Sequence, residues 1–222
     1  MKLVVAALAT AAALAGPSIA SAATLAADPD LRCYPEGSHV FLPGEGFTAN
    51  AQVDFSRDGV PLVPNPPIMA DPAGAIGADL TLPGLLEGQQ TLEYLATDTA
   101  NPANTAALSL LVTATDVSLK PERGKPERLL RIGARGFFGG KSLWAHIKRK
   151  GGGRARNVRI GRIKGPCKKV KAKRRLFSPG AASGTYRVQF DAFRRYRKKR
   201  TYKSLFNVTI FRTVRPNVAR VR

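Results

Sequence analysis

Apolar and polar residues alternate along short stretches of residues 23–222, which is the period of β-strands. Examples are residues 53–55, 143–147 and 206–210, in which every second side chain is apolar. Glycine and proline separate such stretches at short intervals, and no segment carries the i, i+3, i+4 apolar pattern of an amphipathic helix. The pattern therefore predicts an all-β fold of short antiparallel strands packed as a sandwich.

An internal repeat with an offset of 90 residues divides this β-rich region. Residues 39–47 (HVFLPGEGF) align with residues 129–137 (LLRIGARGF), and an alternating segment follows each copy. Further along the chain, residues 88–94 parallel residues 184–190. A period of this length is typical of tandem domains, because solenoid repeats are shorter.

The charge of the chain changes sharply between the two copies. Residues 23–116 contain 12 acidic and 2 basic residues, a net charge of −10, whereas residues 117–222 contain 33 basic and 3 acidic residues, a net charge of +30. Together with Lys2 these give the +21 of the whole chain. We therefore predict an acidic domain over residues 23–116 and a basic domain over residues 117–222, joined near residues 115–117.

Short motifs support a particular kind of sandwich. Each copy of the repeat has a Gly-Phe pair followed by an alternating segment, and residues 71–83 (DPAGAIGADLTLP) follow in the first copy. These features resemble the bacterial extracellular immunoglobulin-like modules of exported actinobacterial proteins. The resemblance implies two tandem immunoglobulin-like β-sandwich domains and the roles such modules carry, namely adhesion, spacing and ligand display. The cysteine pair and core tryptophan of antibody-type domains are absent.

The first 22 residues have the pattern of a cleavable signal peptide. Lys2 precedes an apolar run over residues 3–16, and residues 20–22 (ASA) form a small-x-small cleavage site. The run has 14 residues, fewer than the ~20 that a membrane-spanning helix needs. Pro17 stands where a lipobox would need a cysteine, and no later stretch reads as a membrane span or a sorting tail. We expect a secreted or cell-surface protein, cleaved near Ala22.

Two cysteines, Cys33 and Cys167, fall one in each half of the chain. Disulfides persist outside the cytoplasm, so an inter-domain bridge is one alternative, and free thiols or an intermolecular bond are the others. Neither cysteine has a histidine nearby, and two cysteines are too few for the usual structural zinc sites. The sequence therefore predicts no metal and no cofactor.

Catalytic motifs are missing from the sequence. The only histidines, His39 and His146, have no serine, cysteine or carboxylate at a motif spacing, and there is no nucleophile elbow, zincin motif or phosphate-binding glycine loop. Carboxylate pairs such as Asp54 and Asp58 occupy predicted turns or outward strand positions. We expect no enzyme, and a hydrolase whose site is assembled from distant loops is an alternative.

The basic half concentrates its cations in three clusters, which are the predicted polyanion-binding residues. A net charge of +30 is far above the magnitude of about 2–8 that keeps a small domain soluble, and it costs self-repulsion. The third cluster lies at the predicted tip of a hairpin. The clusters are Lys148, Arg149 and Lys150; Lys168, Lys169, Lys171, Lys173, Arg174 and Arg175; and Arg194, Arg195, Arg197, Lys198, Lys199 and Arg200.

Two aromatic residues accompany these cations. In the predicted strand over residues 143–147, Trp144 and His146 face outward, so Trp144 could stack on a sugar or a base if no loop or domain covers it. Tyr196 lies within the third cluster. We expect the partner to be an anionic cell-envelope polymer, an anionic lipid surface or extracellular nucleic acid, and an acidic protein partner, including the chain's own acidic half, is a further alternative. The leading hypothesis is an exported binding or structural protein, and a nucleic-acid-binding protein is the second.

Overall fold

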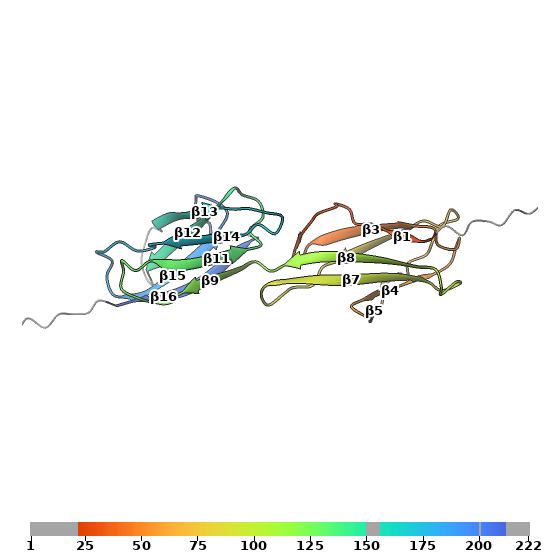
Figure 1. Ribbon diagram of the computed structural model, residues 1–222, viewed down its shortest axis with the longest axis horizontal. Helices are drawn as coiled ribbons and strands as arrows, with labels where there is room; N and C mark the ends of the chain where they lie inside the picture. Colours follow the sequence, from red (N-terminus) through yellow and green to blue (C-terminus); the bar gives the residue numbers. More distant parts are fainter. Residues whose placement is uncertain (1–21, 150–155, 200, 212–222) are drawn as a thin grey trace, which may run out of the picture.

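The computed structural model describes residues 22–149, 156–199 and 201–211, except for the side chain of Arg149. The described residues form sixteen β-strands and no helix, which confirms the all-β prediction. The predicted signal peptide lies outside these residues apart from Ala22. The strands group into two domains that lie end to end along the molecule (Figure 1).

The first domain is a sandwich of a three-stranded and a five-stranded sheet. The strand orders are β1-β3-β6 and β2-β8-β7-β4-β5. The strands are β1 (Thr24–Leu25), β2 (Tyr34–Pro35), β3 (His39–Glu45), β4 (Val53–Arg57), β5 (Val60–Leu62), β6 (Ile76–Thr81), β7 (Gln89–Asp98) and β8 (Thr105–Thr113).

The second domain repeats this topology strand for strand. Its sheets have the orders β9-β11-β14 and β10-β16-β15-β12-β13. The strands are β9 (Asp116–Lys120), β10 (Arg123–Gly124), β11 (Leu130–Arg135), β12 (Ser142–Arg149), β13 (Arg156–Arg162), β14 (Val170–Arg174), β15 (Gly184–Asp191) and β16 (Lys203–Ile210). In both domains the short second strand pairs in parallel with the last strand, and the other pairings are antiparallel.

The alternation of the sequence places the inward residues of both sheets in one core per domain. Leu42 and Ile132, which correspond at the offset of 90 residues, are both buried on the strand that precedes the Gly-Phe pair. Gly46 and Gly136 have φ values of 84° and 75°. A side chain at Gly136 would collide with the carbonyl of Ala114 in the connection between the domains, so glycine is needed there for both conformation and space.

The second part of the repeat has a different register from the one the sequence suggested. Phe55 lies opposite Ala96 in the first domain, and Ala145 lies opposite Phe190 in the second. Because Phe55 and Ala145 correspond at the offset of 90, the β7 and β15 strands correspond at an offset of 94. The parallel between residues 88–94 and 184–190 is therefore wrong by two residues.

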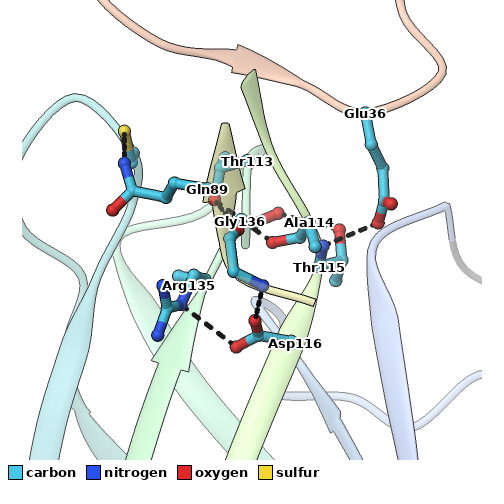
Figure 2. A network of polar contacts seen from close by, with 10 residues as sticks. Glu36, Gln89, Thr113, Ala114, Thr115, Asp116, Arg135 and Gly136 are labelled. Carbon is cyan, nitrogen blue, oxygen red and sulfur yellow. Dashed lines mark hydrogen bonds and ion pairs between the residues drawn. The ribbon is translucent and has the colours of Figure 1, made fainter. Parts of the chain in front are cut away.

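A disulfide joins the two domains. Cys33 precedes β2 and Cys167 precedes β14, and their Cα atoms are 5.2 Å apart. Both residues are buried. The side-chain amide of Gln89 lies 3.0 Å from the Cys167 sulfur, which ties the start of β7 to the bridge (Figure 2). The structure thus has the inter-domain bridge among the alternatives that the cysteine spacing left open.

Polar contacts surround the connection between β8 and β9 (Figure 2). The Glu36 carboxylate accepts a hydrogen bond from the Thr115 amide at 2.7 Å, and the Asp116 carboxylate accepts one from the Gly88 amide at 2.6 Å. Asp116 also pairs with Arg135 at 3.2 Å. The connection has only two residues, and the backbone amide of each donates a hydrogen bond. The two domains therefore have little freedom to rotate relative to each other.

Candidate functional site

A row of three cations crosses the outer face of the three-stranded sheet of the second domain. Arg131 on β11 lies directly opposite Lys120 on β9 and Lys173 on β14. All three side chains are exposed. Directly opposed residues of antiparallel strands have Cβ atoms about 4.5–5.5 Å apart, and like charges at this spacing repel each other. We call these three residues the cation row.

A shallow groove of about 450 Å³ runs beside the cation row. Gly133 and Ser118 both contribute to its lining, and a Cβ atom on Gly133 would lie 2.6 Å from the Ser118 hydroxyl. The Ser118 side chain therefore occupies the space over Gly133. Lys171 adds a fourth cation to the lining.

The fold itself does not require these cations. In the first domain, Phe41 occupies the position of Arg131 at the offset of 90, and its ring packs over Gly77. The same position of the same topology thus holds an aromatic residue in the first domain and a cation in the second. The cation row is therefore a property of the second domain's sequence rather than of the sandwich.

The connection between β15 and β16 carries the third predicted cluster, of which Arg200 lies outside the described residues, and residues 192–199 fold against the outer face of the five-stranded sheet. The Asp191 carboxylate accepts hydrogen bonds from the Phe193 amide at 2.8 Å and from the Gln189 side chain at 2.8 Å. The Gln189 amide also donates to the Arg197 carbonyl at 2.9 Å. β15 and β16 pair as the predicted hairpin, and these bonds hold its cationic connection against the sheet.

His146 lies beneath this segment and is buried, which corrects the prediction that it faces solvent. Its side chain does project from the outward face of β12, but the ring of Tyr196 covers it at a centroid distance of 5.7 Å. Its Nε2 atom lies 3.1 Å from Asp191 Oδ1, and its Nδ1 atom lies 2.8 Å from Asn157 Oδ1. Strand alternation therefore predicted the correct face of β12 for His146. The side chain is nevertheless buried, because the loop that contains Tyr196 covers it.

The His146–Asp191 pair is an ion pair inside the domain. Burial lowers the pKa of His146, but the hydrogen bonds to Asp191 and Asn157 outweigh it and raise the pKa above its usual range. Burial raises the pKa of Asp191, but its bonds to His146, Gln189 and the Phe193 amide outweigh this and lower it. A protonated His146 can donate to both oxygen partners, and this leaves neither ring nitrogen free.

A second hollow, of about 120 Å³, lies next to this pair. Lys148 on β12 lies directly opposite Arg187 on β15, and Lys198 and Lys203 also line the hollow. The Lys148 ammonium sits 5.5 Å from the centre of the Tyr196 ring. Four cations thus line one small hollow.

The predicted polyanion residues differ in their availability. The Lys168 ammonium lies 5.9 Å from the Phe138 ring centre, and Arg174 donates to the Ile160 carbonyl at 3.0 Å, so both make contacts within the domain. Lys150, Arg200 and the side chain of Arg149 lie outside the described residues. The remaining residues of the second and third clusters are exposed: Lys169, Lys171, Lys173, Arg175, Arg194, Arg195, Arg197, Lys198 and Lys199.

The two aromatic candidates are not free surface rings. Trp144 is half-buried on β12, where the strand register places it between Arg159 and Asp191. Tyr196 is half-buried between His146 and Lys148. Stacking of either ring on a ligand remains a prediction.

Four cations of these surfaces were missed by the sequence analysis, which looked for runs of charge. Lys120, Arg131, Arg187 and Lys203 each stand alone in an alternating segment, and the sheet brings them beside other cations. In the sequence, single cations that alternate with apolar residues could have identified these four as outward-facing strand residues. The ion pairs found among the described residues are Asp116–Arg135 and His146–Asp191, and neither joins the two domains.

The described part of the chain contains no group of three histidine, cysteine or carboxylate side chains that could hold a metal ion. It also contains no helix of the length and hydrophobicity needed to cross a bilayer.

No protein-family model and no curated protein matches the chain. Similar solved structures include a protein from Corynebacterium diphtheriae named as membrane-anchored, which is 11% identical, covers 86% of this chain and 57% of its own, and has a TM-score of 0.36. The adhesin InvE from Yersinia pseudotuberculosis is 11% identical, covers 85% of this chain and 58% of its own, and has a TM-score of 0.33. The chain thus spans less than two thirds of either protein, and at this level of similarity neither bears on its ligand.

Proposed function

We propose that this is an exported, non-enzymatic protein whose basic domain binds an anionic polymer or surface at the cell envelope. The observation that carries the proposal is the cation row of Lys120, Arg131 and Lys173 beside its groove. These side chains repel one another in the free protein, so an anion that lies across them relieves the repulsion and adds its own attraction.

The energetic driving force is the release of counterions from the polymer. Cations on a flat sheet face bind regularly spaced anionic groups without reading their sequence, and the affinity falls linearly with the logarithm of the salt concentration. The hollow lined by Lys148, Arg187, Lys198 and Lys203 supplies a second set of contacts on the other sheet. Two basic surfaces on opposite sheets suit an extended or multivalent partner.

The proposed location rests on two features of the chain. The predicted signal peptide directs export, and the Cys33–Cys167 disulfide is a bond that persists in oxidising compartments. Outside the cytoplasm, the polyanions within reach are envelope polymers, anionic lipids and released nucleic acid. A polymer fixed to the envelope would hold the protein at the cell surface.

A binding role is also favoured by the state of His146. Both of its ring nitrogens have oxygen partners inside the domain, and its position beneath Tyr196 keeps it from bulk solvent. A general base needs a free nitrogen within reach of the proton it removes. We therefore assign this pair to the placement of the cationic loop.

The test uses the mature protein, residues 23–222, on heparin and on vesicles containing phosphatidylglycerol, each across a salt gradient. One variant replaces the cation row with glutamine (K120Q/R131Q/K173Q). The matched control removes three exposed cations outside both surfaces (R156Q/R162Q/K164Q), so the net charge of the two variants is equal.

We expect the row variant to lower the slope of log K against log salt by about 1 per lost contact, and the control to change it much less. An affinity that does not depend on the salt concentration would overturn the proposal. Equal losses of affinity in the two variants would overturn the role of the cation row. Tight, saturable binding to duplex DNA, with none to the other probes, would replace the envelope partner by nucleic acid.

A further inference from the structure

The two domains share a topology but differ at one edge of the sandwich. In the second domain, the seven residues of β13 run beside β14, and Arg174 donates to the Ile160 carbonyl at 3.0 Å across this edge. In the first domain, β5 has only three residues. A hollow of about 570 Å³ opens there between β4, β5 and β6. This volume lies within the range of about 300–1,000 Å³ that is usual for ligand pockets.

The walls of this hollow are apolar and polar in about equal parts, and Asn65, Asp79 and Thr81 are among the lining residues. Phe55, Leu62, Ile68 and Ala78 contribute to the apolar part, and a segment with three prolines, residues 63–67, borders the hollow. At its rim, Val63 is 92% exposed and Met69 is 53% exposed. The segment that would close the sandwich edge thus leaves apolar surface open to solvent.

A buried hydroxyl group lies behind these walls. Tyr94 is 1% exposed and lines the hollow, and its hydroxyl makes no hydrogen bond of standard geometry in the described part of the chain. Burial raises the pKa of Tyr94, and Arg57 opposes this effect through a hydrogen-bonding contact and its positive charge. Because the hydroxyl itself is enclosed, a ligand in the hollow meets the Arg57 guanidinium rather than the Tyr94 hydroxyl.

Arg57 supplies a positive charge at the same place. It lies directly opposite Tyr94 on the neighbouring strand and also lines the hollow. It is one of only two basic residues in residues 23–116, and no carboxylate pairs with it in the part of the chain that the structure describes. The guanidinium group has the geometry to bind a carboxylate through two parallel hydrogen bonds.

The second domain has apolar residues at the positions that correspond to Arg57 and Tyr94. Ile147 and Val188 are the cross-strand pair that corresponds to Arg57 and Tyr94, and both are buried aliphatic residues. The first domain therefore places a cation and a hydroxyl where the same fold packs well with two aliphatic side chains. This substitution costs stability unless the polar groups have a use.

We propose that this hollow binds a small amphiphile with an apolar body and a carboxylate head. The head pairs with Arg57, and the apolar body lies along Phe55, Leu62 and Ile68. A single carboxylate suits the site, because the net charge of −10 on this half of the chain repels polyanions. The site is separate from the basic surfaces of the second domain and does not depend on the role proposed for them.

Met69 provides a reporter at the site, because it is the only methionine in residues 23–222. The mature protein, labelled with ¹³C at the methionine methyl, is titrated with dodecanoate below its micelle concentration and, in parallel, with uncharged methyl dodecanoate. Weak attraction of dodecanoate to the basic domain leaves this resonance unmoved. Shifts of Met69 therefore report the hollow alone.

We expect a saturable shift with dodecanoate and a loss of affinity of at least tenfold in Arg57→Gln. The matched control is Arg32→Gln, which removes the other cation of the acidic half and should bind as the unmodified protein does. Methyl dodecanoate should bind equally to the unmodified protein and to Arg57→Gln.

Absence of a saturable shift would overturn the proposal, and so would equal dodecanoate affinity in Arg57→Gln and the unmodified protein. If Arg57→Gln does not fold, the comparison of dodecanoate with methyl dodecanoate on the unmodified protein decides the question, because equal affinities would show that the carboxylate makes no contact of its own.

Discussion

Ala145 lies directly opposite Phe190 in the core of the second domain, and the first domain has the same pair reversed, with Phe55 opposite Ala96. All four side chains are buried. The large side chain thus comes from opposite strands of the same sheet in the two domains. The two sandwiches conserve the volume of this layer rather than the identity of the residues, as close packing requires.

The reversed pair predicts that a swap in the second domain is partly compensated. Phe190→Ala alone should cost about 3–5 kcal/mol through the cavity it leaves, and Ala145→Phe alone about 1–3 kcal/mol through overpacking. The double variant should cost less than the sum by about 0.5–3 kcal/mol. Denaturant unfolding followed by the fluorescence of Trp144, the only tryptophan, measures the second domain. Strictly additive costs would contradict the prediction.

The His146–Asp191 pair predicts a pH dependence of the second domain. The folded pKa of His146 is raised, so its contribution to the free energy of unfolding is complete below the unfolded value of about 6.5 and is lost as the pH rises through the folded value. The contribution of Asp191, whose pKa is lowered, is lost only in acid. The stability of the domain should therefore fall between pH 6 and pH 9.

The measurement compares Trp144 unfolding curves of the unmodified protein and of His146→Gln at both pH values. The variant keeps a side chain that can hydrogen-bond but has no titrating group, so the decrease should shrink. An equal decrease in both proteins would show that another group titrates.

Asp98 makes a corresponding prediction for the first domain. Burial raises the pKa of Asp98, but the Thr48, Ala100 and Asn101 amides donate to its carboxylate and lower the pKa to about 2. Its contribution is present above a pH of about 3.9 and is lost as the pH falls through 2. Asp98→Asn should cost about 1–3 kcal/mol at neutral pH, since the added amide donors face other donors.

Calorimetry resolves this effect, because a transition that Trp144 fluorescence does not follow belongs to the first domain. Asp54→Asn is the matched control, since Asp54 is exposed on the neighbouring strand. A similar loss in both variants would point to overall charge rather than to the buried carboxylate.

The disulfide predicts the flexibility of the junction. Replacing Cys33 and Cys167 with serine leaves the hydrogen bonds around the β8–β9 connection, among them those of Glu36 and Asp116, as restraints. We expect the two domains to reorient, with a broader distance distribution in small-angle X-ray scattering, and the unfolding free energy to fall by about 2–5 kcal/mol. An unchanged scattering curve would mean that the polar contacts alone fix the orientation.

Strand alternation was enough to predict the fold, because its period of two directly marks inward and outward residues. The same property explains the error in the second part of the repeat. A shift of two residues between Gly88 and Gly184 preserves every inward position, so only the hydrogen-bond register reveals it. The offset of 90 in the first part of the repeat holds, since Gly46 and Gly136 both have positive φ and each is followed by a buried phenylalanine.

The basic surfaces of the second domain were predictable only in part. Runs of lysine and arginine marked the second domain as basic, but the cation row joins Lys120, Arg131 and Lys173 from three strands. Such rows depend on strand order and register, which sequence does not give. The exposure of His146 could not be predicted either, because it depends on the path of the loop that follows β15.

The Cys33–Cys167 bridge also determines how the protein would carry mechanical load. Tension applied at residues 22 and 211 passes through the sulfur atoms and bypasses residues 34–166. Only 11 residues before Cys33 and 44 after Cys167 can then extend, a contour length of about 180–200 Å, compared with more than 600 Å for the unbridged chain. The strands from β2 to β13, which include the acidic domain's hollow, are shielded from stretching. Under tension, β1 and β14–β16 would therefore unfold, and the extension would then stop at the disulfide.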